Sequence, residues 1–154
     1  MIIRTADLKD IEKILILEEQ VFELHLKARP DWICKNPLNY DYIKSIIEGN
    51  NGKIFIAEKD HEIIGHCIVF KREIKDHHVL HNMLNIEIDD MCIDEKHRKK
   101  GIGKILFEEV KKFAKDNDAK FIELMVWEFN QNAKKFYEHL GMKTRINRME
   151  LKIK

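Results

Sequence analysis

The residues whose types and spacing could do chemistry lie within residues 85–115. A basic run at 96–100 leads directly into two glycines, Gly101 and Gly103, and apolar residues at helical spacing follow. The first turn of a helix carries partial positive charge and unpaired backbone N–H groups, so acidic residues are normally favoured there. Cations at that end, beside glycines that let the backbone approach a ligand, favour binding of an anion such as phosphate or pyrophosphate. The alternative is a solvated basic turn that binds nothing.

Two common phosphate-binding loops do not fit this turn. A Walker A loop needs a glycine where this chain has Arg98, and a Ser or Thr where it has Ile105. A dinucleotide-binding fingerprint needs a third small residue at the position of Leu106. What remains is Arg98-x-x-Gly101-x-Gly103, directly after a predicted strand.

A second motif lies downstream, at residues 130–142. Its residues are Asn130-x-x-Ala133-x-x-Phe136-Tyr137-Glu138-x-Leu140-Gly141-Met142. Together the two motifs closely resemble those of the GNAT superfamily, the acetyl-CoA-dependent N-acetyltransferases, and the resemblance covers residues 86–142. Met142 stands where the family usually has phenylalanine, and both side chains are apolar.

The pattern of apolar residues predicts alternating strands and helices. We expect strands at 2–5, 53–59, 62–71, 86–93, 121–127 and 148–153, helices at about 7–27, 40–48, 102–115 and 130–140, and a polar loop at 72–84. With the resemblance, this order predicts an α/β (α+β) GNAT-like acyl-CoA N-acyltransferase fold. Its central sheet is mixed and mostly antiparallel, with helices on both faces.

Length and composition favour one domain with a sizeable core, since the chain has 154 residues. The resemblance implies that this is a single N-acetyltransferase domain, 1–154, with a CoA-binding core at 86–142 and an acceptor-side segment at about 20–50. Lys+Arg (28) nearly balances Asp+Glu (27), so the total charge gives no support for a nucleic-acid or membrane partner. The lack of a long apolar run and of a signal-peptide shape, with three scattered cysteines, predicts a cytoplasmic, reduced protein.

The resemblance implies an acyltransferase that moves groups other than amino-acyl groups. It would transfer an acetyl group from acetyl-CoA, the co-substrate, to a primary amine by direct attack in a ternary complex. An alkyl amine is mostly protonated at neutral pH, so the site needs a proton acceptor, donors for the oxyanion, and an acid near the leaving thiolate. No metal is required if the two substrates are held side by side.

Tyr137 is the predicted acid, because it stands where the family's tyrosine commonly lies near the CoA sulfur. The alternative is a core aromatic on the apolar stripe of its helix. Glu87 and Asp89 are the two candidates for the base. Strand periodicity places them on one face and Asp90 on the other. Burial beside a sheet would raise the pKa of either carboxyl. The alternative is that both are solvated or pair with Arg or Lys.

The resemblance also implies the cofactor contacts. The main chain of 91–93 should run beside the pantetheine arm, and a bulge or splay near Met91 would free N–H groups for the acetyl carbonyl. The turn at 98–104 should wrap the pyrophosphate, and the helix that starts at 130 should touch the other side of the arm. The predicted cofactor-binding residues are Met91, Cys92, Ile93, Arg98, Lys99, Lys100, Gly101, Ile102, Gly103, Lys104, Asn130 and Ala133.

Other chemically capable residues favour simpler interpretations. The histidines at 77, 78 and 81 lie in a polar loop without a cysteine partner, which predicts a solvent-exposed loop rather than a metal site. Cys92 is interpreted as a packing residue. Trp32, Tyr40 and Tyr42 could line the acceptor pocket or simply pack a short helix. The acidic side chains Glu18, Glu19 and Glu23 could attract a cationic acceptor or form the solvent-exposed face of a helix.

Three functions are compared. The first is an N-acetyltransferase acting on a small-molecule or peptide amine. The second is a non-catalytic acyl-CoA-binding module, which shares all the CoA residues but needs neither Tyr137 nor a strand carboxylate. The third, a nucleic-acid binder using residues 96–104, is disfavoured by the balanced charge and by the lack of aromatic residues in that patch. The exposed C-terminal strand could pair two subunits into a homodimer.

Overall fold

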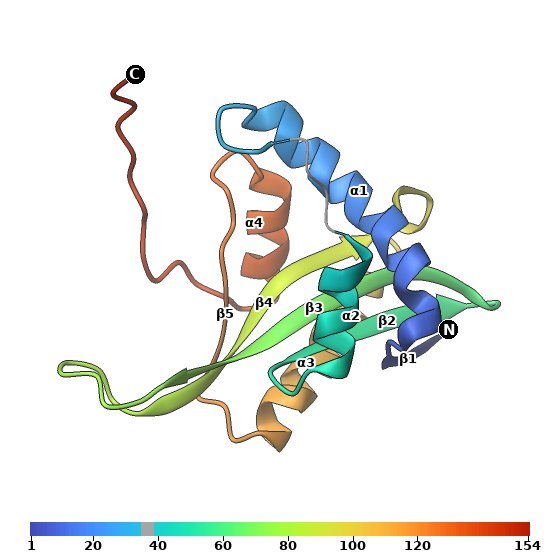
Figure 1. The fold of residues 1–154 in the computed structure, drawn as a ribbon, viewed down its shortest axis with the longest axis horizontal. Coiled ribbons are helices and arrows are strands. Elements are labelled where there is room, and N and C mark those ends of the chain that lie inside the picture. The colour runs from blue at the N-terminus through green and yellow to red at the C-terminus, as the bar shows by residue number, and fades with distance from the viewer. Residues whose placement is uncertain (35–38) are drawn as a thin grey trace.

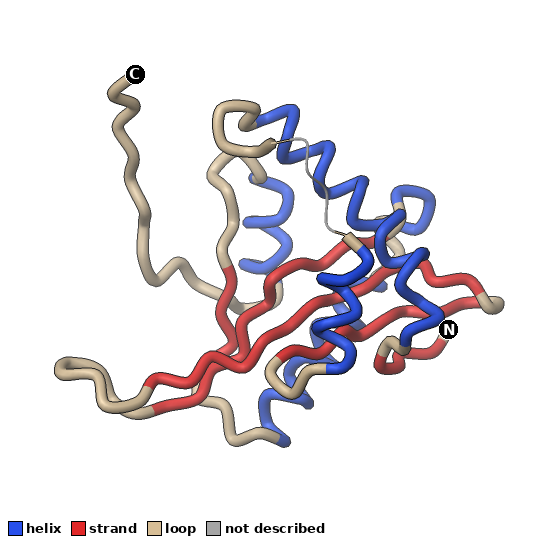
Figure 2. The backbone as a smooth tube through the Cα atoms, in the orientation of Figure 1, coloured by secondary structure: helices blue, strands red, loops and turns tan. Residues whose placement is uncertain are grey.

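The computed structural model describes residues 1–34 and 39–154, and its sheet and helices follow the predicted order (Figures 1 and 2). The elements are β1 (Ile2–Thr5), α1 (Ile11–Ala28), α2 (Tyr40–Glu48), β2 (Gly52–Lys59), β3 (Glu62–Ile74), β4 (Met83–Ile93), α3 (Ile102–Asp116), β5 (Phe121–Leu124) and α4 (Gln131–His139). Short 3-10 turns at Leu8–Asp10 and Glu95–His97 precede α1 and α3.

The five strands lie in their sequence order, β1-β2-β3-β4-β5. The first four pair antiparallel, and β5 pairs parallel to β4. Asp60 and His61 join β2 to β3 with φ angles of 50° and 64°, which is the left-handed backbone of a tight hairpin. The mixed, mostly antiparallel sheet is therefore as predicted.

Two apolar layers cover the sheet. On one face the buried residues Ile14 of α1 and Ile43 of α2 pack with Ile68 of β3. On the other face Leu106 and Val110 of α3 pack with strand residues, and Tyr137 of α4 packs against the same cluster. In Figure 1, α1 and α2 cross the viewer's side of the sheet and α3 lies behind it. The edges of the sheet thus remain the places where backbone is accessible.

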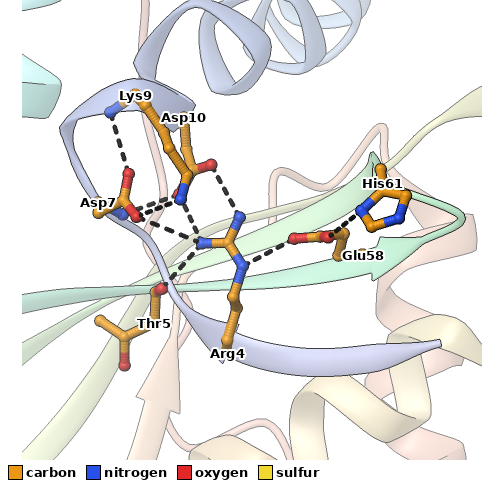
Figure 3. Close-up of polar contacts among 7 residues, drawn as sticks. All are labelled: Arg4, Thr5, Asp7, Lys9, Asp10, Glu58 and His61. Atoms are coloured by element: carbon orange, nitrogen blue, oxygen red, sulfur yellow. Dashed lines mark hydrogen bonds and ion pairs between the residues drawn. The ribbon is translucent and has the colours of Figure 1, made fainter.

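Arg4 ties the start of the chain to this sheet (Figure 3). Its guanidinium donates to the Asp10 carboxylate at 2.7 and 2.9 Å and to the Glu58 carboxylate at 2.7 Å. The hydrogen bonds from Arg4 lower the pKa of the buried Asp10 carboxyl. Asp7 caps the 3-10 turn, since its side chain accepts the Lys9 N–H at 3.0 Å, and α1 begins at Ile11 rather than at about residue 7 as predicted.

Three predicted boundaries are wrong. The loop predicted at 72–84 is shorter, because β3 continues to Ile74 and β4 begins at Met83; the two strands extend beyond the rest of the sheet (Figure 2). The strand predicted at 121–127 ends at Leu124, where β4 and β5 separate. The predicted strand at 148–153 is absent: residues 143–154 contain no helix or strand and run away from the body (Figure 1). An alternating pattern forms a strand only where another backbone pairs with it.

None of the helices in the described part of the chain has the length and apolar character to cross a membrane.

Candidate active site

A β-bulge in β4 sets the geometry of the site. Ile88 pairs with Val69 and Asp90 pairs with Ile68, so Asp89 is an extra residue without a partner on β3. A bulge of this kind reverses the alternation of faces beyond it. The prediction that Asp90 faces away from Glu87 and Asp89 is therefore wrong.

The packing on either side of the bulge shows the reversal. Ile88 packs on the α3 face, whereas Cys92, four residues on, packs on the α1 face. Asp90 consequently points toward α1, where it meets His66. A bulge was predicted near Met91 and lies two residues earlier.

The bulge is also where β4 leaves β5. Their ladder ends at Ile88 opposite Leu124, and beyond it the two segments diverge (Figure 1). In the described residues, the main chain from Met91 to Ile93 pairs only with β3. One edge of this backbone is thus available to hydrogen-bond a ligand that enters between the two strands.

The glycine turn presents backbone N–H groups at the start of α3. Lys99 and Gly101 have φ angles of 61° and 80°, and a β-carbon at Gly101 would meet no atom within 4 Å, so the backbone conformation alone requires glycine there. The Ile105 N–H donates to the Gly101 carbonyl at 3.2 Å, so the N–H groups of 102–104 precede the first such bond and point out of the helix. Such an arrangement fits a phosphate or pyrophosphate.

The Arg98 side chain bonds to residues of this turn and of the strand before it. Its Nε donates to the Ile93 carbonyl at 3.0 Å, and Nη1 lies 3.4 Å from the Glu95 carboxylate. Lys100 Nζ likewise donates to the Lys96 carbonyl at 3.0 Å. The side chains shape the turn, and its backbone faces outward.

The second motif contacts this turn through Phe136. A β-carbon at Gly103 would lie 3.0 Å from the Phe136 ring, which shows how closely α3 and α4 approach. Asn130 caps α4 by accepting the Ala133 N–H at 3.1 Å, so two predicted cofactor-binding residues are bonded to each other. The two motifs, separate in sequence, therefore meet at Gly103 and Phe136.

Tyr137 lies in the packed layer between α3 and α4. Its ring centroid is 6.4 Å from that of Phe107 and 5.0 Å from that of Phe136. Burial raises the pKa of its phenol well above the ordinary value, and the nearby Asp90 carboxylate acts in the same direction. The phenol therefore keeps its proton at neutral pH and can donate it. The same position also suits a core aromatic, so packing alone does not separate the two interpretations.

The two predicted bases have different surroundings. Arg72 donates to the Glu87 carboxylate at 2.6 and 3.1 Å, the pairing with arginine that the sequence left open. Asp89 is exposed as a residue, but partial burial of its carboxyl raises its pKa, and the charges of Asp90 and Glu87 add to this rise. Asp89 thus has the property expected of a base, whereas Glu87 is held as an ion pair.

A cluster that sequence reasoning missed lies beneath the bulge. His66 of β3 is fully buried, and its Nε2 lies 2.5 Å from Glu18 Oε1 of α1 and 3.2 Å from Asp90 Oδ2 of β4. Burial raises the pKa of Glu18 to about 7. Burial lowers the pKa of His66, but the hydrogen bonds to Asp90 and Glu18 outweigh it and raise that pKa to about 9. Among the described residues this is the one group of three His, Cys or acidic side chains close enough to share an ion.

The sequence does carry a signal for this cluster. Glu18 lies on the apolar face of α1 and not on its solvent-exposed face. Helical spacing places it in one stripe with Ile11, Ile14 and Val21. His66 similarly stands inside the apolar run of β3. Charged residues at buried positions are rare unless they are paired.

The loop histidines and Cys92 have surroundings that fit their predicted non-catalytic roles. The side chains of His77, His78 and His81 are exposed on the loop after β3, as predicted. Cys92 donates its S–H to the Leu17 carbonyl at 3.2 Å, and burial raises the pKa of its thiol to about 12, which fits packing and not nucleophilic attack.

In the acceptor-side segment, Trp32 and Tyr40 are exposed, and Tyr42 is partly buried near the Asp89 carboxyl. Residues 35–38 of that segment lie outside the described residues.

Comparison with known proteins agrees with this architecture. Residues 18–142 match the model of the Acetyltransferase (GNAT) family. A solved structure of a tetramutant of the BH1408 protein from Bacillus halodurans is 31% identical, with a TM-score of 0.95, 99% of this chain and 100% of that chain being covered.

Two more distant structures share the fold. A ribosomal-protein-alanine N-acetyltransferase from Brucella melitensis biovar Abortus 2308 is 15% identical, covers 99% of this chain and 100% of its own, and has a TM-score of 0.73. The aminoglycoside N-acetyltransferase AAC(6')-Iy, solved in complex with CoA, is 14% identical, covers 99% of both chains and has a TM-score of 0.75. The predicted fold is confirmed, and the chain belongs to the acetyltransferase (GNAT) family, which implies acyl transfer from acyl-CoA.

Proposed function

We propose that this protein, acting as a single domain over residues 1–154, transfers an acetyl group from acetyl-CoA to a primary amine by direct attack in a ternary complex. The observation that carries the proposal is the meeting of three features at one end of the sheet. They are the outward N–H groups of the glycine turn, the backbone edge of β4 beyond Ile88 that no described residue pairs with, and the protonated phenol of Tyr137.

The cofactor contacts follow from these features. The N–H groups at the start of α3 would bind the pyrophosphate, and the backbone of 91–93 would hydrogen-bond the pantetheine arm as a neighbouring strand does. Asn130 and Ala133, at the start of α4, would border the other side of the arm. The thioester would then lie beside the bulge, where an N–H group of β4 can stabilise the oxyanion.

The residues near the thioester supply the acid and the base. Tyr137 would protonate the leaving thiolate. Of the two strand carboxylates first considered, Asp89 is favoured over Glu87, because the Arg72 guanidinium occupies the Glu87 carboxylate. The acceptor would approach over α2, past Tyr42 and Asp89.

A non-catalytic acyl-CoA-binding module is the second candidate, since it would use the same turn and strand edge. Release of CoA thiol from acetyl-CoA, measured with a panel of amines, separates the two. The names of the structural neighbours suggest that the panel include aminoglycosides and peptides with a free N-terminal alanine. Amine-dependent thiol release supports the enzyme; binding of acetyl-CoA in calorimetry without release from any amine supports the module, and absence of binding refutes both.

A further inference from the structure

We infer that Glu18, His66 and Asp90 form the site that receives the proton of the acceptor's primary ammonium group, with Glu18 and Asp90 as catalytic residues and His66 as the residue that positions them. This inference rests on the proposed function. It adds to Asp89 a second, enclosed proton-accepting group, and it assigns the acceptor to the class of cationic primary amines.

The geometry of the three groups is that of a shared proton. Both carboxylates face the same ring nitrogen, His66 Nε2, at 2.5 and 3.2 Å. The other ring nitrogen, Nδ1, is buried and has no hydrogen-bond partner among the described residues. With its raised pKa His66 is an imidazolium at neutral pH, so its Nε2–H has two carboxylate acceptors while its Nδ1–H has none among the described residues. The cluster thus holds its exchangeable proton between three elements of the fold.

Burying three ionisable side chains costs free energy, which a purely structural role does not explain. Glu18 and His66 sit among apolar side chains of the layer beneath α1, which includes Leu17 and Ile68. Buried ionic groups are commonly no more stabilising than apolar side chains of similar volume. Perturbed titratable groups in such a setting are more often found at functional sites.

Its place relative to the thioester supports the role. Asp90 is the more open member, its side chain 19% exposed against 0% for His66, and it directly follows the bulge residue Asp89. The charge of Asp90 also acts on the phenol of Tyr137, which lies in the layer on the opposite face of the sheet. The proton acceptor and the proton donor therefore approach the splayed end of β4 from its two sides.

The reaction balances with these residues alone. The ammonium group gives one proton to the carboxylate cluster, and its nitrogen lone pair forms the bond to the acetyl carbon. The bond from that carbon to sulfur breaks, and Tyr137 protonates the thiolate. The second proton of the nitrogen restores the phenol, and the cluster returns its proton to solvent.

The phenols and thiols around the cluster do not ionise near pH 7. Burial raises the pKa of each of them, so each stays neutral there: Tyr42 of α2, Cys67 of β3, Cys92 of β4 and Tyr137 of α4. Asp89 is the remaining carboxyl nearby whose pKa is raised. An ionisation close to pH 7 in kcat/KM therefore identifies Glu18 and its partners, provided that Asp89 is tested in parallel.

The test is the pH dependence of kcat/KM for an amine found in the panel, in wild type and in the Glu18→Gln and Asp90→Asn variants. We expect wild-type activity to rise with pH through about 7, and each variant to lose this rise and about 100-fold of its activity at pH 7. The KM for acetyl-CoA and the thermal unfolding midpoint should change little in Glu18→Gln, since the amide can still hydrogen-bond to His66. Glu12→Gln, an exposed change on the same helix, is the matched control.

The outcomes distinguish the inference from the function it rests on. A wild-type chain without amine-dependent thiol release refutes the proposed function. An active wild type whose profile is unchanged in Glu18→Gln, or is abolished by Asp89→Asn alone, refutes the cluster as proton acceptor.

Discussion

Substitution of Gly101 separates the role of its backbone conformation from the role of space. The residue has a φ of 80°, and an added β-carbon would meet no atom within 4 Å. A residue with a β-carbon is therefore disfavoured only by the left-handed conformation, which costs about 1–2 kcal/mol for most residues. Asparagine tolerates this region and valine does not, so the expected order of destabilisation is Asn, then Ala, then Val.

The size of the effect follows from that conformational cost. A loss of about 1–2 kcal/mol in Gly101→Ala lowers the unfolding midpoint by about 2–8 °C in a chain of this length. If the turn relieves the strain by rotating its N–H groups away from the ligand, the affinity for acetyl-CoA falls by roughly 5- to 30-fold. Thermal unfolding and calorimetric titration with acetyl-CoA measure the two quantities.

Gly141 provides the matched control. Its φ is 91°, and it too has no atom within 4 Å of an added β-carbon, but it lies at the end of α4 and not in the turn. Gly141→Ala should lower the midpoint by a similar amount and leave acetyl-CoA affinity within twofold. Equal losses of affinity in the two variants, or an Asn variant of Gly101 as weak as the Val variant, would refute the role given to the turn.

The remaining predictions concern single side chains. Tyr137→Phe should leave acetyl-CoA binding nearly intact and slow turnover at least tenfold, by the usual contribution of a general acid, and an unchanged kcat would remove this role. Profiles of kcat/KM against pH for Glu87→Gln and Asp89→Asn should differ from each other, with the larger change in Asp89→Asn; wild-type profiles in both would exclude the two. Asp10→Asn should destabilise the chain near pH 7. Arg4 lowers the pKa of Asp10, so this stability is present above about pH 4, the usual value for Asp, and is lost as the pH falls through the lowered pKa. Urea unfolding at pH 7 and pH 3 should therefore show a smaller difference between variant and wild type at pH 3.

Local sequence signals predicted the regular elements well. The helix at 102–115 was visible because its apolar stripe begins just after Gly101 and its end is marked by Asn117. The strand that precedes it and the helix that follows at 131–139 were equally clear, so the glycine turn and the start of the last helix near Asn130 could be predicted from the sequence alone.

The sequence could not show features that depend on contacts between distant segments. Whether Asp90 faces α1 or α3 depends on one bulge residue, and strand periodicity assumes that no such residue exists. Glu18, His66 and Asp90 meet only when α1, β3 and β4 are assembled. The C-terminal alternation predicted a strand at 148–153 that the structure does not contain, since an alternating pattern does not say which backbone will pair with it.

The extra residue in β4 also constrains how this protein can change. Deleting Asp89 would place Asp90 directly after Ile88 and restore an uninterrupted ladder, with Asp90 and Cys92 still toward α1 and Met91 and Ile93 still toward α3. The contact between Asp90 and His66 would survive, whereas the local twist that a bulge produces would be lost together with the Asp89 carboxyl. Adding one more residue to this segment, by contrast, would exchange the two faces of everything from Asp90 to Ile93, so shortening the strand by this one residue should be better tolerated than lengthening it.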